Sequence, residues 1–208
     1  MRTYKKFCIL FFIAHCSLAN SIQTISISEQ QKIMSSSTWH SGCPVPMSQL
    51  RAVFVPYYGF DKQIHQGELI VNQSIAQSVL QLFNTLASMH FPIRQIQPME
   101  NFNGDDELSM EADNTSAFNC RTIKGSDKYS WHAYGLAIDI NPKENPSVNL
   151  TTGEVDPKNA VYSRGKNPPM GTITQSIVNL FAKSGWNWGG NWHAVKDYQH
   201  FEKGLWSN

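Results

Sequence analysis

Residues 130–140 read Ser-Trp-His-Ala-Tyr-Gly-Leu-Ala-Ile-Asp-Ile, and this stretch decides the fold. Aliphatic side chains at positions 136, 138 and 140 alternate with Ala137 and Asp139, and a period of two predicts a half-buried strand. Asp139 then points away from the aliphatic face. Gly135 opens the strand and permits the sharp turn that would bring His132 back toward Asp139. An imidazole and a carboxylate brought together in this way suit a zinc ion.

The end of the chain offers a third ligand, within the run Asp197-Tyr-Gln-His-Phe-Glu202. His200 lies in a short aromatic segment that we expect to form another strand or the end of one. Two histidines and one carboxylate leave a fourth coordination position open, which is typical of catalytic rather than structural zinc. The sequence therefore predicts a zinc site built from His132, Asp139 and His200.

Three motifs together resemble a known family. The pattern S-x-H-x-x-G-x-A-x-D at 130–139 is followed by W-x-W-G-G-x-W at 186–192 and D-x-x-H-F at 197–201. This combination resembles the zinc D-alanyl-D-alanine carboxypeptidases, a family that includes VanY-type peptidases and phage L-alanyl-D-glutamate endolysins. The resemblance extends over roughly residues 42–204. It implies an α+β fold of the hedgehog/D,D-peptidase type, in which a small antiparallel sheet carries the metal and helices pack on its other face.

The resemblance also implies roles for residues around the metal. Asp197 matches the family's acidic residue that moves a proton, although Glu202 is a rival because in a strand it lies on the same side as His200. Arg121 matches an arginine that would stabilise negative charge on the scissile carbonyl, and its alternative is an ordinary ion pair. Ser130 matches a position near the substrate, and its alternative is a hydroxyl that only caps a turn.

The resulting functional hypothesis is an exported zinc peptidase that acts on peptidoglycan stem peptides. The terminal D-Ala-D-Ala bond is the expected substrate, which makes the protein a D,D-carboxypeptidase. An endopeptidase that cuts an internal L,D or D,D bond is a close alternative. A non-catalytic zinc or cell-wall-binding protein is a further one, because hedgehog-type signalling domains resemble this fold. We expect a monomer.

Composition supports one exported domain. The chain has 208 residues, of which 41% are hydrophobic and 12% aromatic, enough for one sizeable core. Residues 1–19 resemble a secretory signal with a basic start and a short apolar centre. A partly ordered lead-in is expected over 20–41 and the zinc peptidase domain over 42–208. Cleavage leaves a slightly negative charge, which does not suggest nucleic-acid binding, and no later apolar run reaches membrane-spanning length.

Two cysteines follow the predicted signal, Cys43 and Cys120. In an exported chain such a pair predicts a disulfide. The alternative, two thiol ligands for a metal, is weaker because neither cysteine lies in a C-x-x-C arrangement. The bond would tie the N-terminal segment to the stretch just before the zinc motif.

The hydrophobic pattern predicts the scaffold around the site. Strands are expected over 50–58 and 67–71 as a hairpin, with a short one over 93–96. An amphipathic helix is expected over 72–89, capped by Asn72 or Ser74, and another over 172–184. We expect a polar loop over 99–128, whose acidic run fits no calcium-binding pattern, and a long insertion over 141–171. A long loop inside a compact domain is often functional, so the insertion is expected to form one wall of the substrate groove.

Overall fold

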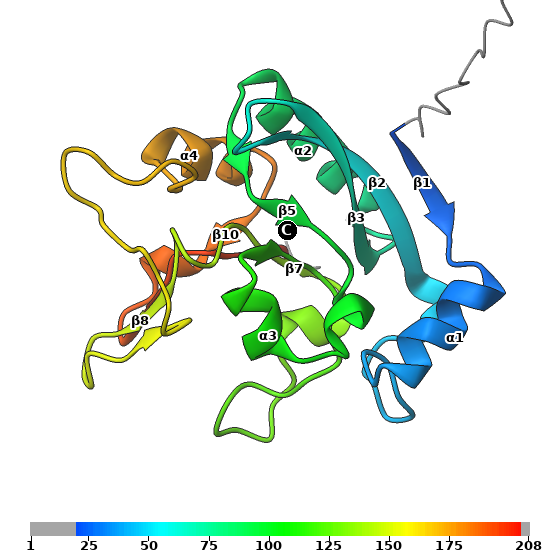
Figure 1. The fold of residues 1–208 in the computed structure, drawn as a ribbon. Coiled ribbons are helices and arrows are strands. Elements are labelled where there is room, and N and C mark those ends of the chain that lie inside the picture. The colour runs from blue at the N-terminus through cyan, green and yellow to red at the C-terminus, as the bar shows by residue number, and fades with distance from the viewer. Residues whose placement is uncertain (1–19, 205–208) are drawn as a thin grey trace, which may run out of the picture.

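The computed structural model describes residues 20–204, so the predicted signal over 1–19 lies outside the described residues. The fold is α+β, as predicted, with helices packed around small, mainly antiparallel sheets (Figure 1). The helices are α1 (Ile27–Ser35), α2 (Ala76–Ser88), α3 (Asp106–Glu111) and α4 (Gln175–Lys183). Among residues 20–204, no helix is long and apolar enough to cross a membrane.

The largest sheet contains the predicted hairpin. Strand β2 (Leu50–Gly59) pairs antiparallel with β3 (Ile64–Asn72) over their whole length. Strand β1 (Ser21–Thr24) pairs antiparallel with β2 along its first half, and the two-residue strand β4 (Pro92–Ile93) pairs parallel with its end. The β2–β3 hairpin thus forms the main part of the largest sheet.

Helix α2 packs on this sheet through the predicted apolar stripe. Its buried residues recur at spacings of three and four, which is the period of one helix face. The helix begins later than predicted, at Ala76, and its N-cap residue Ile75 makes no side-chain cap. Asn72 does not cap the helix. Its side chain instead accepts hydrogen bonds from the amide and hydroxyl of Ser74 in the preceding turn.

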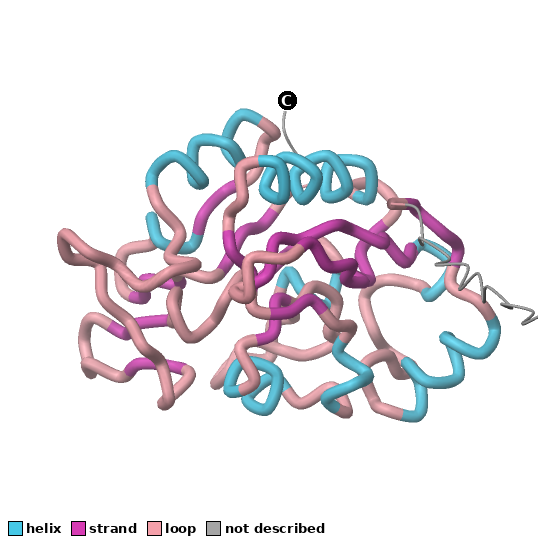
Figure 2. The backbone as a smooth tube through the Cα atoms, turned by 45° about the horizontal axis from the view of Figure 1, so that its top comes forward, coloured by secondary structure: helices cyan, strands magenta, loops and turns pink. Residues whose placement is uncertain are grey.

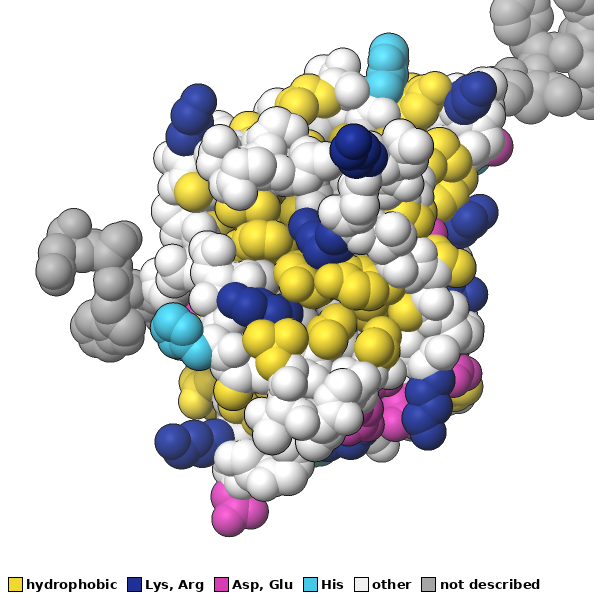
Figure 3. All heavy atoms as spheres, turned by 90° about the vertical axis from the view of Figure 1, so that its left-hand side faces the viewer, with side chains coloured by type: hydrophobic (Ala, Val, Ile, Leu, Met, Phe, Trp, Pro, Cys, Tyr) yellow, Lys and Arg dark blue, Asp and Glu magenta, His cyan; other side chains and the backbone are white. Residues whose placement is uncertain are grey.

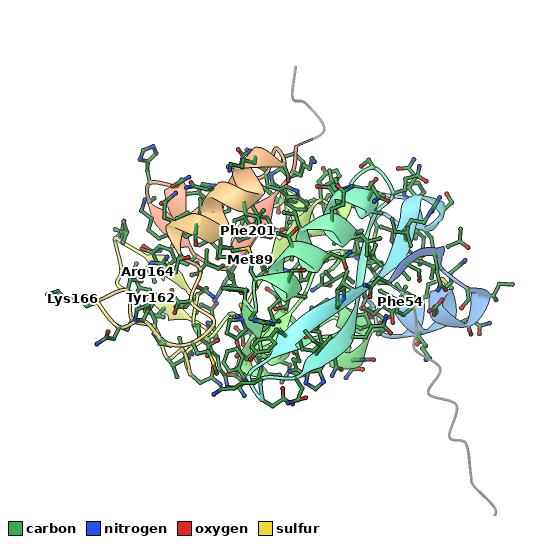
Figure 4. The ribbon with its side chains drawn as sticks, turned by 90° about the horizontal axis from the view of Figure 1, so that it is seen from above. Phe54, Met89, Tyr162, Arg164, Lys166 and Phe201 are labelled. Carbon is green, nitrogen blue, oxygen red and sulfur yellow. A yellow bond between two sulfur atoms is a disulfide. The ribbon has the colours of Figure 1, made fainter. Side chains whose placement is uncertain are left out.

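A second, smaller sheet holds the strand predicted after Gly135. Strand β7 (Ala137–Asp139) pairs with β12 (His200–Glu202), and β12 pairs with β10 (Asn187–Trp188), all antiparallel. Leu136, Ile138 and Ile140 enter the main core, as the alternation predicted. Phe201 enters the same core and stacks on Phe181 of α4, with ring centroids 3.9 Å apart (Figure 4). Helices α2 and α4 lie on the same side of the strands (Figure 2).

Gly135 makes the turn that was predicted. Its φ of +68° lies in the left-handed region, and it ends the short 3₁₀ helix η3 (Trp131–Tyr134) that carries His132. A Cβ atom at this position would lie 2.7 Å from the backbone nitrogen of Asn72. The Gly135 carbonyl also accepts a hydrogen bond from that nitrogen at 2.9 Å. The turn is therefore pressed directly against the end of β3.

The structure differs from the prediction in two further segments. Residues 20–41 are not a partly ordered lead-in, because they form β1 and then α1, which starts with a complete capping box between Ser26 and Glu29. The expected strand over 93–96 is split into β4 and β5 (Gln95–Ile96), which belong to different sheets. Strand β5 pairs parallel with β6 (Asn114–Thr115).

The polar segment 99–128 is not all loop, which corrects the prediction made for it. It contains a 3₁₀ helix η2 (Met99–Phe102) and helix α3, whose N-cap Asp105 accepts a hydrogen bond from the Leu108 amide. The acidic run therefore begins a helix, where the macrodipole favours negative charge.

The predicted disulfide is present, and it joins Cys43 to Cys120 across 77 positions of sequence.

The insertion after β7 is held against the body of the protein. Strands β8 (Ser147–Asn149) and β9 (Val155–Asp156) form a hairpin, and β8 also pairs with β11 (Val195–Asp197). Further along, the Arg164 guanidinium lies 4.2 Å from the centre of the Tyr198 ring and donates to the Ile173 carbonyl. Tyr162 stacks on the same Tyr198 ring, and Figure 4 labels Tyr162 next to Arg164. On this face, hydrophobic side chains are interspersed with Lys and Arg (Figure 3).

The contact beneath Gly135 gives a first prediction. We expect Gly135→Ala to lower the free energy of unfolding by about 1–3 kcal/mol more than Gly153→Ala, measured by urea denaturation. Gly153 is the matched control because it also has a positive φ, +75°, but a Cβ there meets nothing within 4 Å. Equal losses in the two variants would mean that the packing of this turn against β3 contributes nothing.

Candidate metal centre and active-site cavity

The antiparallel register of β7 and β12 places two of the predicted ligands side by side. Asp139 and His200 are directly opposite each other across the two strands. The His200 Nδ1 atom lies 3.0 Å from Asp139 Oδ1. His132 comes from the turn before β7, and its Nε2 atom lies 3.1 Å from Asp139 Oδ2 and 3.1 Å from His200 Nδ1. All three side chains are buried.

These distances fit a shared cation. Ligand atoms bound to zinc at 2.0–2.1 Å in a tetrahedron are roughly 3.3 Å apart. The donor set, two imidazole nitrogens and a carboxylate, is one that zinc accepts, and within residues 20–204 these three side chains converge closely enough to hold one ion. The structure thus brings together His132, Asp139 and His200, the three ligands predicted from the sequence.

Each imidazole is oriented by a second partner. The Nδ1 atom of His132 is hydrogen-bonded to the Ala117 carbonyl, so its Nε2 lone pair faces the other ligands. His200 is turned the opposite way, because its Nε2 atom lies 3.3 Å from Glu202 Oε2 and its Nδ1 faces Asp139. A histidine that donates its outer N–H to a carboxylate or carbonyl is the usual arrangement around a protein-bound metal.

The buried side chains of Asp139 and His200 affect each other's pKa. Burial alone would lower the pKa of His200, but its hydrogen bonds to Asp139 and Glu202 raise that pKa to about 10. Burial alone would raise the pKa of Asp139, but the two imidazoles hold it well below its usual range. Asp139 and His200 therefore stabilise each other's charged form.

Asp197 lies beside the group, at the end of β11. Its Oδ1 atom is buried and has no hydrogen-bond partner among the described side chains and backbone. Burial, followed by the negative charge of Asp139, raises the pKa of Asp197 to about 6. Gly189 allows this approach, because a Cβ there would lie 2.6 Å from the Asp197 carbonyl oxygen and 3.2 Å from the His200 Cβ. The atoms that approach Gly189 most closely therefore belong to strands β11 and β12.

The two rivals for the proton-transfer role occupy different places. Asp197 lines a cavity of about 550 Å³ that also reaches Asp139. Glu202 is absent from the residues that line this cavity and contacts the outer nitrogen of His200 instead. Of these two carboxylates, only Asp197 lines the cavity and can meet a molecule there.

The remaining predicted residues are Arg121 and Ser130. Arg121 lines the cavity and forms a 2.8 Å ion pair with Asp106 of α3, while its buried Nε has no hydrogen-bond partner in the described part of the chain. Ser130 is buried, and its hydroxyl oxygen accepts from the His132 amide at 3.3 Å, as the turn-cap alternative requires. The contact of Ser130 with substrate stays a prediction.

Other residues that line the cavity are not among the predicted site residues. The insertion contributes the β8–β9 hairpin to the wall, in line with the prediction for that segment as a whole. Asp106 and Lys124 come from the segment interpreted as a solvated loop. Trp192, whose ring centroid lies 5.2 Å from that of His200, borders the cavity and is not among the predicted site residues. In the sequence, Trp192 stood out only as the last residue of the W-x-W-G-G-x-W motif.

Comparison with known proteins agrees with this geometry. Residues 124–203 match the model of a family described as D-alanyl-D-alanine carboxypeptidase. Neither the curated proteins nor the solved structures give a match to the chain. The matched segment contains the three converging ligands and Asp197, but not Arg121 or the β2–β3 hairpin. The resemblance drawn from the sequence motifs is thus confirmed over residues 124–203, where the chain is similar to this family of D-alanyl-D-alanine carboxypeptidases.

Proposed function

We propose that the protein is an exported zinc peptidase that hydrolyses peptidoglycan stem peptides. The terminal D-Ala-D-Ala bond is the bond that we expect it to cleave. The observation that carries this proposal is the convergence of His132, Asp139 and His200 beside Asp197, within the segment that matches the peptidase family. Export is supported by the Cys43–Cys120 disulfide, since such bonds persist in oxidising compartments. Residues 1–19 are proposed as the signal and the remainder as the catalytic domain.

The donor set fits zinc, and His132, Asp139 and His200 are its proposed ligands. A zinc ion held by these residues would act as a Lewis acid and would lower the pKa of water at the site to about 7. Asp197 is the group that accepts the proton of the attacking water and returns it to the leaving amine. Its unpartnered Oδ1 atom is free to make that hydrogen bond. A buried carboxylate without a partner is costly unless it has such a use.

Arg121 is proposed to stabilise the negative charge that develops on the scissile carbonyl oxygen. Its ion pair with Asp106 fixes the guanidinium at the cavity wall and leaves the Nε–H without a partner in the described region. The structural ion pair considered as an alternative for Arg121 therefore exists, but it uses one nitrogen and leaves others for a substrate.

The proposed peptidase activity is tested with muropeptides that end in D-Ala-D-Ala. We expect the zinc-loaded protein to release one alanine, detected by mass spectrometry, and Asp197→Asn to lower kcat by roughly 10²–10⁴-fold while keeping its zinc, because an amide cannot accept the proton. Cleavage inside the stem or cross-bridge would support the endopeptidase alternative. Full zinc content without any cleavage would contradict the proposal and favour a binding protein.

The contact between Glu202 and His200 predicts an effect on metal affinity. We expect Glu202→Gln to weaken zinc binding roughly 10–100-fold, because the carboxylate orients the ring and raises its basicity. Competition with a chromophoric chelator measures the dissociation constant directly. Glu111→Gln, at an exposed glutamate of α3, is the matched control and should leave the constant unchanged. If both variants bind zinc as the parent protein does, Glu202 has no role in orienting the ligand.

A further inference from the structure

The cavity extends from the metal group to a pair of carboxylates that the proposed chemistry does not use. Glu154 and Asp156 both line it, from the end of the β8–β9 hairpin. Figure 1 shows this hairpin, α3 and the 122–129 loop on the same lower side of the molecule. The other cavity carboxylates already have a partner or a proposed role, because Asp106 pairs with Arg121, Asp139 belongs to the metal group, and Asp197 moves the proton.

An ammonium group already sits between the two carboxylates. The Lys124 Nζ atom lies 3.8 Å from Glu154 Oε1 and 3.8 Å from Asp156 Oδ2. These distances exceed the 2.7–2.9 Å of a charge-assisted hydrogen bond, and the Lys124 side chain is 75% exposed. Such a contact is weak and easily exchanged. One lysine also leaves a surplus negative charge on the pair.

A second feature of the cavity also calls for a hydrogen-bond donor. Gln199 is only 2% exposed and lines the cavity, yet its Oε1 atom has no partner within residues 20–204. Its amide nitrogen donates to the Met110 sulfur, which also lines the cavity. A buried carbonyl oxygen left without a donor is costly, so a ligand that brings N–H groups into the cavity would be favoured.

We propose that Glu154 and Asp156 form a subsite for the primary ammonium of a side chain in the peptide substrate, a site that Lys124 occupies until the substrate displaces it. This inference rests on the proposed peptidase function, and it narrows the substrate class to peptides with a free side-chain amine near the scissile bond. It also gives the insertion a specific role, which is to recognise the charge of that side chain.

The test compares two synthetic peptides that end in D-Ala-D-Ala and differ only in whether the lysine side chain before this pair is free or Nε-acetylated. With the zinc-loaded protein, we expect kcat/KM to be at least roughly tenfold higher for the free amine. In the double variant Glu154→Gln/Asp156→Asn, kcat/KM for the free-amine peptide should fall to the value for the acetylated peptide. The kcat/KM for the acetylated peptide should not change. Asp127→Asn, in the same loop as Lys124, is the matched control and should keep the preference.

The variant Lys124→Ala tests whether Lys124 competes with the substrate for the two carboxylates or is itself needed for cleavage. If Lys124 is a resident competitor, its removal should raise kcat/KM for the free-amine peptide several-fold and leave the acetylated peptide unaffected. Equal cleavage of both peptides by the parent protein, or a Lys124→Ala variant impaired on both peptides, would overturn the subsite.

The inference can also be separated from the proposed hydrolysis. If neither peptide is cleaved, the peptidase proposal fails, and calorimetry with the same two peptides decides about the subsite. Tighter binding of the free-amine peptide, lost in the double variant, supports it. Equal affinities overturn it.

Discussion

The structure depends on the antiparallel pairing of β7 with β12. This register sets Asp139 opposite His200, and the turn at Gly135 then brings His132 to the same point. The neighbouring residues Ile138 and Phe201 are fully buried in the main core, so the strands cannot slip without exposing them. A shift of one residue would turn every side chain to the other face, which couples the metal group to the hydrophobic core.

Burial of the group has an electrostatic consequence. A carboxylate and two imidazoles that are buried together must balance their charges locally. The rings are oriented by hydrogen bonds to the Ala117 carbonyl and to Glu202, so that His132 Nε2 and His200 Nδ1 both face Asp139. Around this fixed centre the cavity wall comes from loops and from the insertion, which is where specificity can vary while the ligands stay in place.

The sequence predicted the site where the signal was local. The alternation over 136–140, the glycine turn and the histidine near the C-terminus were enough to predict the three side chains that the structure brings together. Helices α1 and α3 were not predicted, although the sequence contains their capping signals. Ser26 and Glu29 have capping-box spacing, and Asp105 precedes an acidic first turn. Contacts between distant segments left no local signal. The Asp106–Arg121 ion pair and the approach of Lys124 to the β8–β9 hairpin are of this kind.

The central claim is that one zinc ion binds at the convergence of His132, Asp139 and His200. Anomalous diffraction at the zinc absorption edge, from crystals of the purified protein supplied with one equivalent of zinc, tests it directly. We expect a single strong peak, bonded to His132 through Nε2, to His200 through Nδ1 and to the Asp139 carboxylate at about 2.0–2.2 Å. A fully occupied zinc elsewhere, or one bound to the Nε2 atom of His200 with Glu202 displaced, would contradict it.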